Sequence, residues 1–220
     1  MHKCASCKVF KNCFASTLSN SDLLEFEKEI KLLTLSKGDI VFVEKKSANR
    51  IFSLLSGTVK LEHNYNLSNP MIIRIIHQGE FFGLESLLNN RNYLYSAISM
   101  GDTVCCSAPK THLEKYLLVN KDFCSILLNK LQDEQERLYK YSITMISGSS
   151  QAKLALALCS ITDREEKLNA TKEEIAIMTG LTRETVSRLL SKMNTEGIIE
   201  TNQRKIKILD KSELTKLIGT

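Results

Sequence analysis

The sequence predicts an α+β fold: an antiparallel β-roll, then a long helix, then a C-terminal group of short helices with a hairpin. Short β-rich runs alternate with turn residues between about residues 35 and 107. Residues 110–162 lack proline and contain a single glycine, which favours helix. After them come a capped helix, a glycine turn and a second capped helix. These changes of pattern along the chain indicate successive structural parts rather than one repeated unit.

The composition is that of a soluble globular protein, with 43% hydrophobic and 25% charged residues in a chain of 220. No apolar run approaches the ~18 residues that span a bilayer, and the polar N-terminus does not resemble a secretory signal. We therefore expect a cytoplasmic protein that does not enter membranes. The odd number of cysteines, 7, agrees with a reducing compartment in which disulfides are disfavoured.

Residues 1–18 form a cysteine-bearing arm with the spacing C-x2-C-x5-C, made by Cys4, Cys7 and Cys13. Thiolates bind iron–sulfur clusters and structural zinc, so thiols this close together favour a metal site. A thiol–disulfide switch between Cys4 and Cys7 is an alternative, as is a site that has lost its metal. Neighbouring basic residues are expected to favour the thiolate form: Lys3, Lys8 and Lys11.

Residues 19–109 are predicted to form the β-roll. A helix is expected first, over residues 20–34, because apolar and charged residues alternate at helical spacing after Ser21. The β-rich runs then fall at 40–43, 51–55, 58–61, 71–76, 93–100 and 103–107. Strands this short, separated by glycine, asparagine and proline turns, are typical of an antiparallel roll or barrel.

Residues 110–148 are predicted to form a dimerisation helix. Apolar residues recur there every seven positions: Leu131, Leu138 and Met145. This repeat is typical of a coiled-coil seam. Gln135 and Ser142 lie near seam positions where apolar residues are expected, so we predict a homodimer interface of limited strength. A helix that packs on its own domain is the alternative.

Residues 149–220 are predicted to form a winged helix-turn-helix that binds double-stranded DNA. A capping box from Thr171 to Glu174 begins one helix, and Gly180 lies in the turn before the next. The residues expected to contact DNA are Thr182, Arg183, Glu184, Ser187, Arg188 and Lys205. Side chains near the start of the second helix would contact base edges, whereas lysines of the hairpin would contact phosphate. A solvated charged face is the alternative interpretation.

Three segments of the chain match a known family: Ser56–Leu61, Gly79–Gly83 and Leu181–Leu190. Over nearly all of its length, the chain resembles the CRP/FNR superfamily of bacterial transcriptional regulators. That resemblance implies a homodimer that binds palindromic DNA and acts together with RNA polymerase. No Ser-His-Asp, paired-carboxylate or phosphate-loop pattern is apparent in the sequence, so we expect no enzymatic activity.

The cysteine spacing is similar to that of the FNR branch of oxygen sensors. This similarity implies a [4Fe-4S] cluster whose ligands are Cys4, Cys7, Cys13 and a distant fourth cysteine. In that branch the fourth cysteine lies three residues before a proline at the end of the roll. Pro109 therefore places it at Cys106, with the neighbouring Cys105 as the alternative. The resemblance also implies TTGAT-like half-sites, which Arg183, a departure from the branch, would alter.

Cyclic AMP is not an expected ligand. Members of the superfamily that bind it carry a glutamate after the Gly-x-x-Gly segment and an arginine in a later Arg-Ser-Ala. Here Leu84 follows Gly83, and Tyr95 stands in place of the arginine that would pair with the phosphate. Control by thiol oxidation, or by a small ligand in the roll, is the alternative to cluster sensing. A thioredoxin-like enzyme is disfavoured because no strand precedes Cys4.

Overall fold

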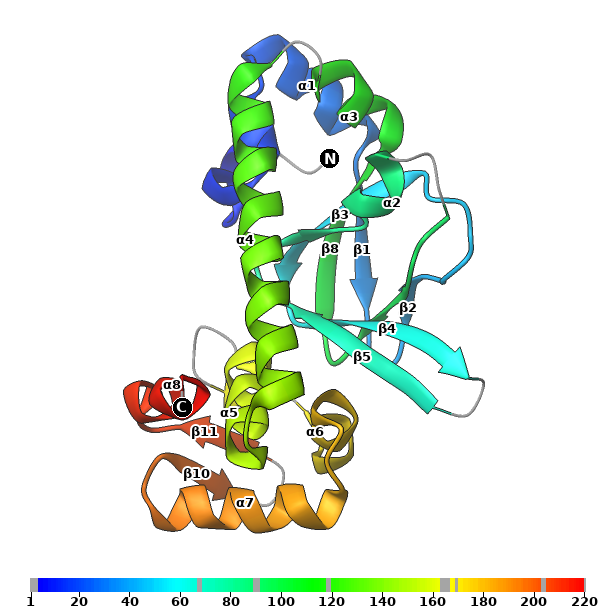
Figure 1. The fold of residues 1–220 in the computed structure, drawn as a ribbon. Coiled ribbons are helices and arrows are strands. Elements are labelled where there is room, and N and C mark those ends of the chain that lie inside the picture. Colours follow the sequence, from blue (N-terminus) through cyan, green and yellow to red (C-terminus); the bar gives the residue numbers. More distant parts are fainter. Residues whose placement is uncertain are drawn as a thin grey trace. The chain divides into compact units, whose positions relative to one another are not determined.

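The structure is a computed structural model, and it describes the chain except residues 1–3, 67–68, 89–91, 118–119, 163–166, 169, 203–204 and 220. The chain divides into two compact units (Figure 1). One unit comprises Met1–His63 with Ile76–Glu134, and the other comprises Asn64–Ile75 with Gln135–Thr220. In the described part of the chain, no helix is long and apolar enough to cross a membrane.

The cysteine arm folds into three short 3-10 helices: Cys4–Ser6, Phe10–Asn12 and Phe14–Thr17. Helix α1 (Asn20–Glu29) follows, and its N-cap is Ser19, whose side chain accepts the backbone N–H of Asp22. The helix expected over 20–34 is wrong at its C-terminal end. Strand β1 (Lys31–Leu35) begins two residues after α1 and pairs with β8 (Thr103–Pro109), so pairing with a distant strand overrides the local helical pattern.

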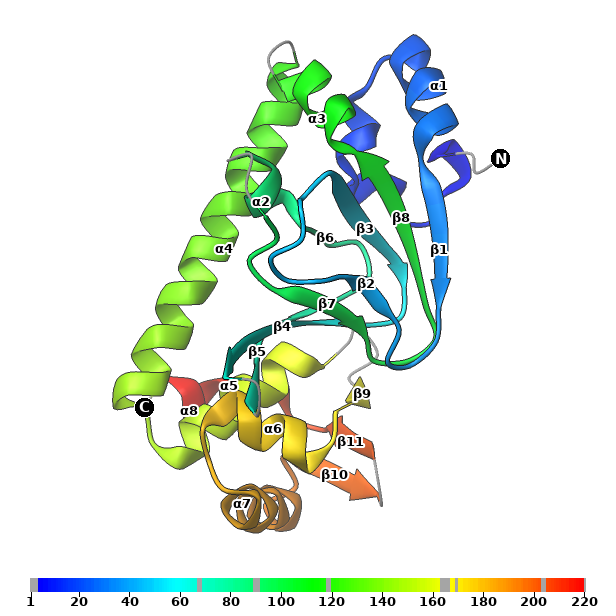
Figure 2. The same ribbon diagram turned by 90° about the vertical axis from the view of Figure 1, so that its right-hand side faces the viewer.

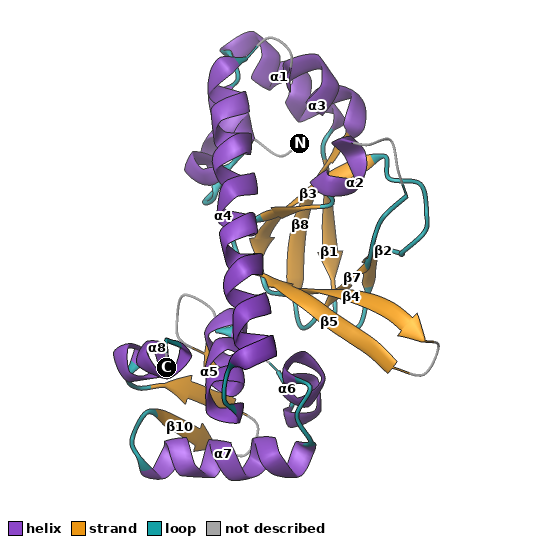
Figure 3. Cartoon of the chain, in the orientation of Figure 1, coloured by secondary structure: helices purple, strands orange, loops and turns teal. Residues whose placement is uncertain are grey.

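Two antiparallel sheets make up the β-roll (Figure 3). The first has the strand order β1-β8-β3-β6, in which β3 is Arg50–Ser56 and β6 is Phe81–Phe82. The second has the order β2-β7-β4-β5. Its strands are β2 (Ile40–Phe42), β7 (Ser96–Ser99), β4 (Val59–Asn66) and β5 (Asn69–Ile76). The short helix α2 (Leu84–Leu88), which the sequence did not predict, follows β6.

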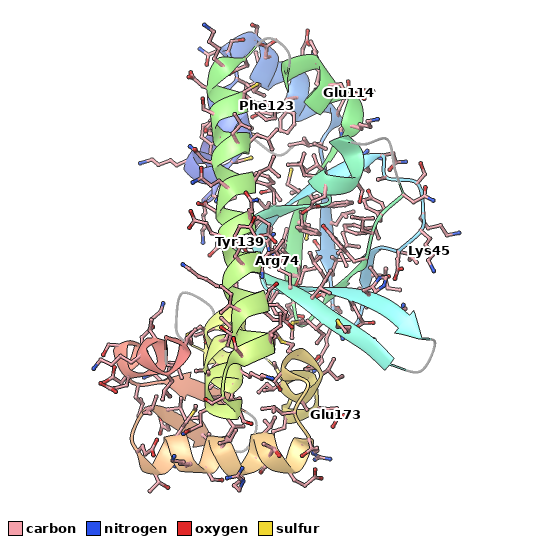
Figure 4. The ribbon with its side chains drawn as sticks, viewed as in Figure 1. Lys45, Arg74, Glu114, Phe123, Tyr139 and Glu173 are labelled. Atoms are coloured by element: carbon pink, nitrogen blue, oxygen red, sulfur yellow. The ribbon has the colours of Figure 1, made fainter. Side chains whose placement is uncertain are left out.

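The helical region after the roll is divided into three helices, whereas one long helix was expected over 110–162, with 110–148 as its dimerisation part. These are α3 (Lys110–Leu117), α4 (Lys121–Ser147) and α5 (Ser150–Ile161). Asn120 is the N-cap residue directly before α4, and its side-chain oxygen accepts the backbone N–H of Phe123 at 2.9 Å. Figure 4 shows Phe123 on the first turn of α4, where its side chain is buried. Ser149 caps α5 in the same way.

The C-terminal elements follow the predicted order, with one additional strand. They are β9 (Lys167–Leu168), α6 (Lys172–Thr179), α7 (Arg183–Thr195), β10 (Ile199–Asn202), β11 (Lys205–Ile208) and α8 (Lys211–Ile218). The predicted capping box at Thr171 and Glu174 is present, and both of its hydrogen bonds form. The strand β9, which the sequence did not predict, extends the predicted hairpin to a three-stranded sheet in the order β10-β11-β9.

Candidate DNA interface and cysteine site

Helix α7 packs with its apolar face in the core of this region and leaves its charged face exposed to solvent. Gly180 ends α6 in the left-handed conformation with φ of 65°, and Thr182 then caps α7 by accepting the backbone N–H of Thr185. The apolar residues of α7 are buried in the core of this region: Val186, Leu189, Leu190 and Met193. Arg183 and Arg188 are exposed, as a helix that reads base edges requires.

The predicted DNA-contacting residues all lie on α7, its cap or the hairpin. Thr182 and Glu184 are exposed, and Ser187 is half-buried. Lys205 lies on β11, opposite Asn202 of β10, and its side chain is outside the described part of the structure. Asn194 joins the hairpin to α7, because its side-chain oxygen accepts the backbone N–H of Thr201 at 2.8 Å.

Lys172 is a residue of this surface that the sequence analysis missed. It is the first residue of α6, and its Nζ donates a hydrogen bond to the Ser187 hydroxyl at 3.0 Å. The exposed ammonium group therefore lies beside the predicted base-reading positions. The sequence offered no signal for this contact, because Lys172 and Ser187 are 15 residues apart and lie on different helices.

The structure separates the adjacent cysteines of β8. Successive side chains of a strand point to opposite faces of a sheet. Cys105 is fully buried between Leu33 and Leu54 on the neighbouring strands, whereas Cys106 is only partly buried. The strand neighbours of Cys106 are Leu32 of β1 and Ser53 of β3.

The arm lies on the face of the sheet that carries Cys106. The Ser53 hydroxyl, next to Cys106 in register, hydrogen bonds to the thiol of Cys13. Burial raises the pKa of Cys106 to about 12, and negative charge on Cys13, Cys4 and Cys7 contributes in the same direction. Such charge effects act over short distances. The structure thus gathers the thiols of the arm near Cys106.

The surroundings of Cys105 are different. Burial alone raises the pKa of Cys105 to about 12, without a contribution from any thiol of the arm. Burial also raises the pKa of Cys4 to about 12, with smaller contributions from Glu27, Cys13 and Cys7. The expectation that neighbouring lysines favour the thiolate form in the arm is therefore wrong for Cys4, because burial and like charge dominate there.

The gathered thiols form a donor set of sulfur atoms alone. In the described part of the chain, no three His, Cys, Asp or Glu side chains are already at metal-binding distance. Thiols whose pKa values are raised by burial and by one another favour deprotonation only if positive charge enters among them. Iron and zinc supply such charge and prefer sulfur ligands, so the chemistry of these thiols suits a thiolate-bound metal group, while their positions in the described structure do not form one.

Aromatic rings fill the part of the roll next to Gly83. Phe42 stacks on Tyr93 with 3.9 Å between ring centroids, and it also contacts Phe52, Phe82 and Tyr95. The Tyr95 hydroxyl donates a hydrogen bond to Oε2 of Glu85 at 2.5 Å. Tyr95 stands where cyclic-AMP-binding relatives would carry arginine, and here its hydroxyl is satisfied by a carboxylate of the chain itself.

Helix α4 exposes apolar side chains along much of its length. Leu131 and Leu138 are 39% and 49% exposed, as a seam for a second copy requires. Met145 is only partly exposed, whereas the next residue, Ile146, is 84% exposed. The exposed apolar residues of α4 are Leu128, Leu131, Leu138, Tyr139, Ile143 and Ile146. Figure 4 labels Tyr139 on this helix.

A β-roll followed by a long helix and a winged helix-turn-helix with an exposed basic face defines a DNA-binding transcription regulator, which is a non-enzymatic class of protein. The family model for the cyclic nucleotide-binding domain matches residues 32–120, and that for the Crp-like helix-turn-helix domain matches residues 152–217. The chain belongs to the CRP/FNR family of transcriptional regulators. The predicted fold class is thereby confirmed.

Several known regulators are similar over nearly the whole chain. The regulatory protein HlyX of Actinobacillus pleuropneumoniae is 25% identical over 227 residues, which cover 96% of this chain and 92% of that protein. The fumarate and nitrate reduction regulatory protein of Vibrio cholerae is 22% identical over 98% of this chain and 90% of its own length. The structure of FixK2 from Bradyrhizobium japonicum has a similar fold, with a TM-score of 0.75 and 21% identity over 86% of this chain and 96% of FixK2.

Proposed function

We propose that this regulator binds palindromic DNA as a homodimer under the control of a [4Fe-4S] cluster whose ligands are Cys4, Cys7, Cys13 and Cys106. The observation that carries the proposal is the gathering of the arm thiols around Cys106 but not around Cys105. The relatives named for anaerobic and for fumarate and nitrate regulation support the same kind of signal.

The residues around the site would hold the group and exclude water from it. Burial of Cys4 and Cys106 keeps their thiols protonated until a metal replaces the protons. When bound, a cluster supplies iron that oxygen or nitric oxide attacks. Loss of the cluster would return the site to neutral thiols and would remove the link that runs through the metal between the arm and β8.

Thiol oxidation without a metal is the weaker alternative. A redox-sensing cysteine is accessible and has a lowered pKa, because the thiolate is the reactive form. Here burial raises the pKa values of Cys4 and Cys13. Buried thiols in the neutral form react slowly with peroxides and disulfides, which favours sensing through a bound metal group.

DNA recognition would use the exposed face of α7. Arg188 and Arg183 suit guanine, Glu184 suits cytosine N4, and Ser187 suits either kind of partner. We propose TTGAT-like half-sites, with Arg183 adding a guanine contact, and phosphate contacts from the hairpin at Lys205. A dimer along α4 would present two α7 helices to successive turns of the duplex, and bound dimers would contact RNA polymerase.

The decisive experiment is purification of the full chain under argon, followed by visible absorption and by iron and sulfide analysis. We expect a brown protein with about four irons per chain that loses its colour and its DNA affinity in air. Cys106→Ser should remove both the iron and the anaerobic DNA binding, whereas the matched control Cys105→Ser should keep them. A colourless protein with stoichiometric zinc would overturn the cluster proposal.

A further inference from the structure

Glu27 is a buried carboxylate beside the cysteine arm. It lies on α1 and is only 8% exposed. Its Oε1 accepts the backbone N–H of Cys4 at 2.5 Å, and its carboxylate also hydrogen bonds to the Cys4 thiol. A carboxylate is seldom buried without groups that compensate its lost hydration. Among the described residues Cys4 supplies that compensation, and no Lys, Arg or His there pairs with Glu27.

Other residues of α1 fix this helix to α3. Lys115 pairs with Oε2 of Glu25 at 2.5 Å, and Phe26 meets the ring of His112 edge-on with 5.5 Å between centroids. Phe26 is 2% exposed, so this contact belongs to the core. Residues two apart on a helix differ in direction by about 200°. Glu27 therefore points away from Glu25. Helix α1 is held against α3 on one side, and on another side its Glu27 carboxylate contacts the arm.

Helix α1 is also connected to the strand that lies beside Cys106. Helix α1 continues through Ile30 into β1, and Leu32 of β1 pairs in register with Cys106 of β8 (Figure 2). The segment α1–β1 thus touches Cys4 through Glu27 and Cys106 through Leu32. At Cys4 itself, the contact between the arm and this segment is made by the hydrogen bonds of Glu27.

We propose that Glu27 is a positioning residue that docks the cysteine arm onto α1 and so sets the separation of Cys4 and Cys106. The inference deepens the proposed function, since it concerns the same thiols. Glu27 acts through its hydrogen bonds to Cys4 and not as a ligand, so its effect on the arm can be measured without iron.

The test measures the accessibility of each thiol in the reduced, metal-free full chain. Iodoacetamide is the probe, and alkylation at each cysteine is followed by mass spectrometry. Glu27→Ala should raise the alkylation rate of Cys4 about tenfold, because the buried hydrogen bonds that hold the arm are lost. Glu27→Gln should restore most of the protection, because the amide oxygen still accepts the Cys4 N–H.

Matched controls separate docking from folding. Glu25→Gln removes an exposed ion pair of the same helix and should leave the rate at Cys4 unchanged. Cys105 is the internal reference, because it is fully buried and burial alone raises its pKa, without a contribution from any thiol of the arm. Equal rates at Cys4 in the wild type and in Glu27→Ala would overturn the inference. An equal rise at Cys105 would also overturn it, because Glu27 would then stabilise the whole roll.

A second measurement distinguishes this inference from the proposed function. After anaerobic reconstitution with iron and sulfide, Glu27→Ala should retain about a tenth of the wild-type iron at limiting iron, and Glu27→Gln most of it. If the wild type takes up no iron, the cluster proposal fails, while the alkylation rates still decide the role of Glu27. Full wild-type loading of Glu27→Ala would contradict the inference.

Discussion

Single residues decide which cysteine can take part in the thiol site. Cys105 and Cys106 are neighbours in sequence, and the spacing to Pro109 leaves both open. The alternation of side chains along β8 turns Cys105 into the roll and Cys106 toward the arm. A sequence pattern predicts the presence of a strand better than its register. The register of β8 against β1 and β3 was therefore needed to tell Cys105 from Cys106.

The caps of α6 and α7 were predictable, because a capping residue acts on the backbone within three positions of itself. Thr171 and Thr182 illustrate this. Glu27 and Lys172 were not predictable, since their partners lie 23 and 15 residues away. Such contacts depend on how the elements are brought together, which periodicity alone does not specify.

Base-reading and phosphate-contacting residues should behave differently in DNA-binding assays. Arg188→Ala should weaken binding by about 1–3 kcal/mol and relax the preference at one base pair of each half-site. Lys205→Ala should weaken binding to all sequences alike and reduce the salt slope by about 1. Fluorescence anisotropy over a series of salt concentrations and half-site variants measures both. An Arg188→Ala protein with unchanged sequence preference would contradict the assignment.

Tyr141 should make unfolding depend on pH in the alkaline range. Its hydroxyl donates a hydrogen bond to the carbonyl of Met178 at 3.1 Å, and burial raises its pKa above the usual 10.0. The folded state thus holds the proton more tightly than the unfolded state, so this contribution is complete below pH 10 and is lost as the pH rises further. Tyr141→Phe should lower the free energy of unfolding by about 1 kcal/mol at pH 8. Denaturant titrations should show this difference shrinking above pH 10.

At the scale of elements, α1 and β1 show where a local pattern misleads. Residues 31–35 continue the apolar spacing of the helix, yet they form an edge strand of the first sheet. The long helix was likewise predicted as one piece, because Asn120 and Ser149 look like ordinary polar residues until their capping hydrogen bonds are seen. The order of the elements was predicted well, and their ends less well.

Gly57 should be far less tolerant of substitution than Gly38, although both have positive φ. A Cβ at Gly57 would lie 2.4 Å from the carbonyl oxygen of Asp102, whereas one at Gly38 would meet nothing within 4 Å. Gly57→Ala should therefore cost about 3 kcal/mol of the free energy of unfolding, because backbone strain and a clash add. Gly38→Ala should cost about 1 kcal/mol. Equal losses in chemical denaturation would contradict this account.

The exposed apolar face of α4 is the element on which the proposed dimer depends. Leu138→Asp should raise the dimer dissociation constant at least about tenfold, since a seam position would then carry a charge. Lys140→Asp is the matched control, because this residue is exposed on the same helix about 200° away from Leu138. Sedimentation velocity over a concentration series measures both variants. A monomeric wild type at all accessible concentrations would contradict the seam.

At the scale of the whole molecule, the cysteine site and the DNA-contacting helix belong to different compact units. The cysteines of the arm and of β8 lie in the first compact unit, and α7 with its basic face lies in the second. Helix α4 belongs partly to each unit, since the division falls between Glu134 and Gln135. Gln135 is also one of the two polar residues, with Ser142, that are predicted to weaken the seam. The proposed signal site and the predicted DNA-contacting face would therefore be connected through this helix, for which the sequence predicts a dimer seam of limited strength.

Replacing that polar residue should loosen the dependence of DNA binding on the signal. Gln135→Leu should give a tighter dimer that keeps at least about a third of its anaerobic DNA affinity in air, because packing of the seam would replace the contribution of the proposed cluster. Gel-shift titrations of wild type and variant under argon and in air measure the ratio. Loss of affinity in air equal to that of the wild type would show that the seam is not the coupled element.

The docking of the arm beside Cys106 has a further consequence for the lifetime of the protein. A group bound by Cys13 and Cys106 would close a long loop of chain and raise the cost of unfolding the roll. Once the group is lost, only noncovalent contacts would hold the cysteine arm, and cellular proteases would reach its residues more easily. Exposure to air would then shorten the survival of the regulator as well as switch it off, so its abundance would itself record the recent history of the cell.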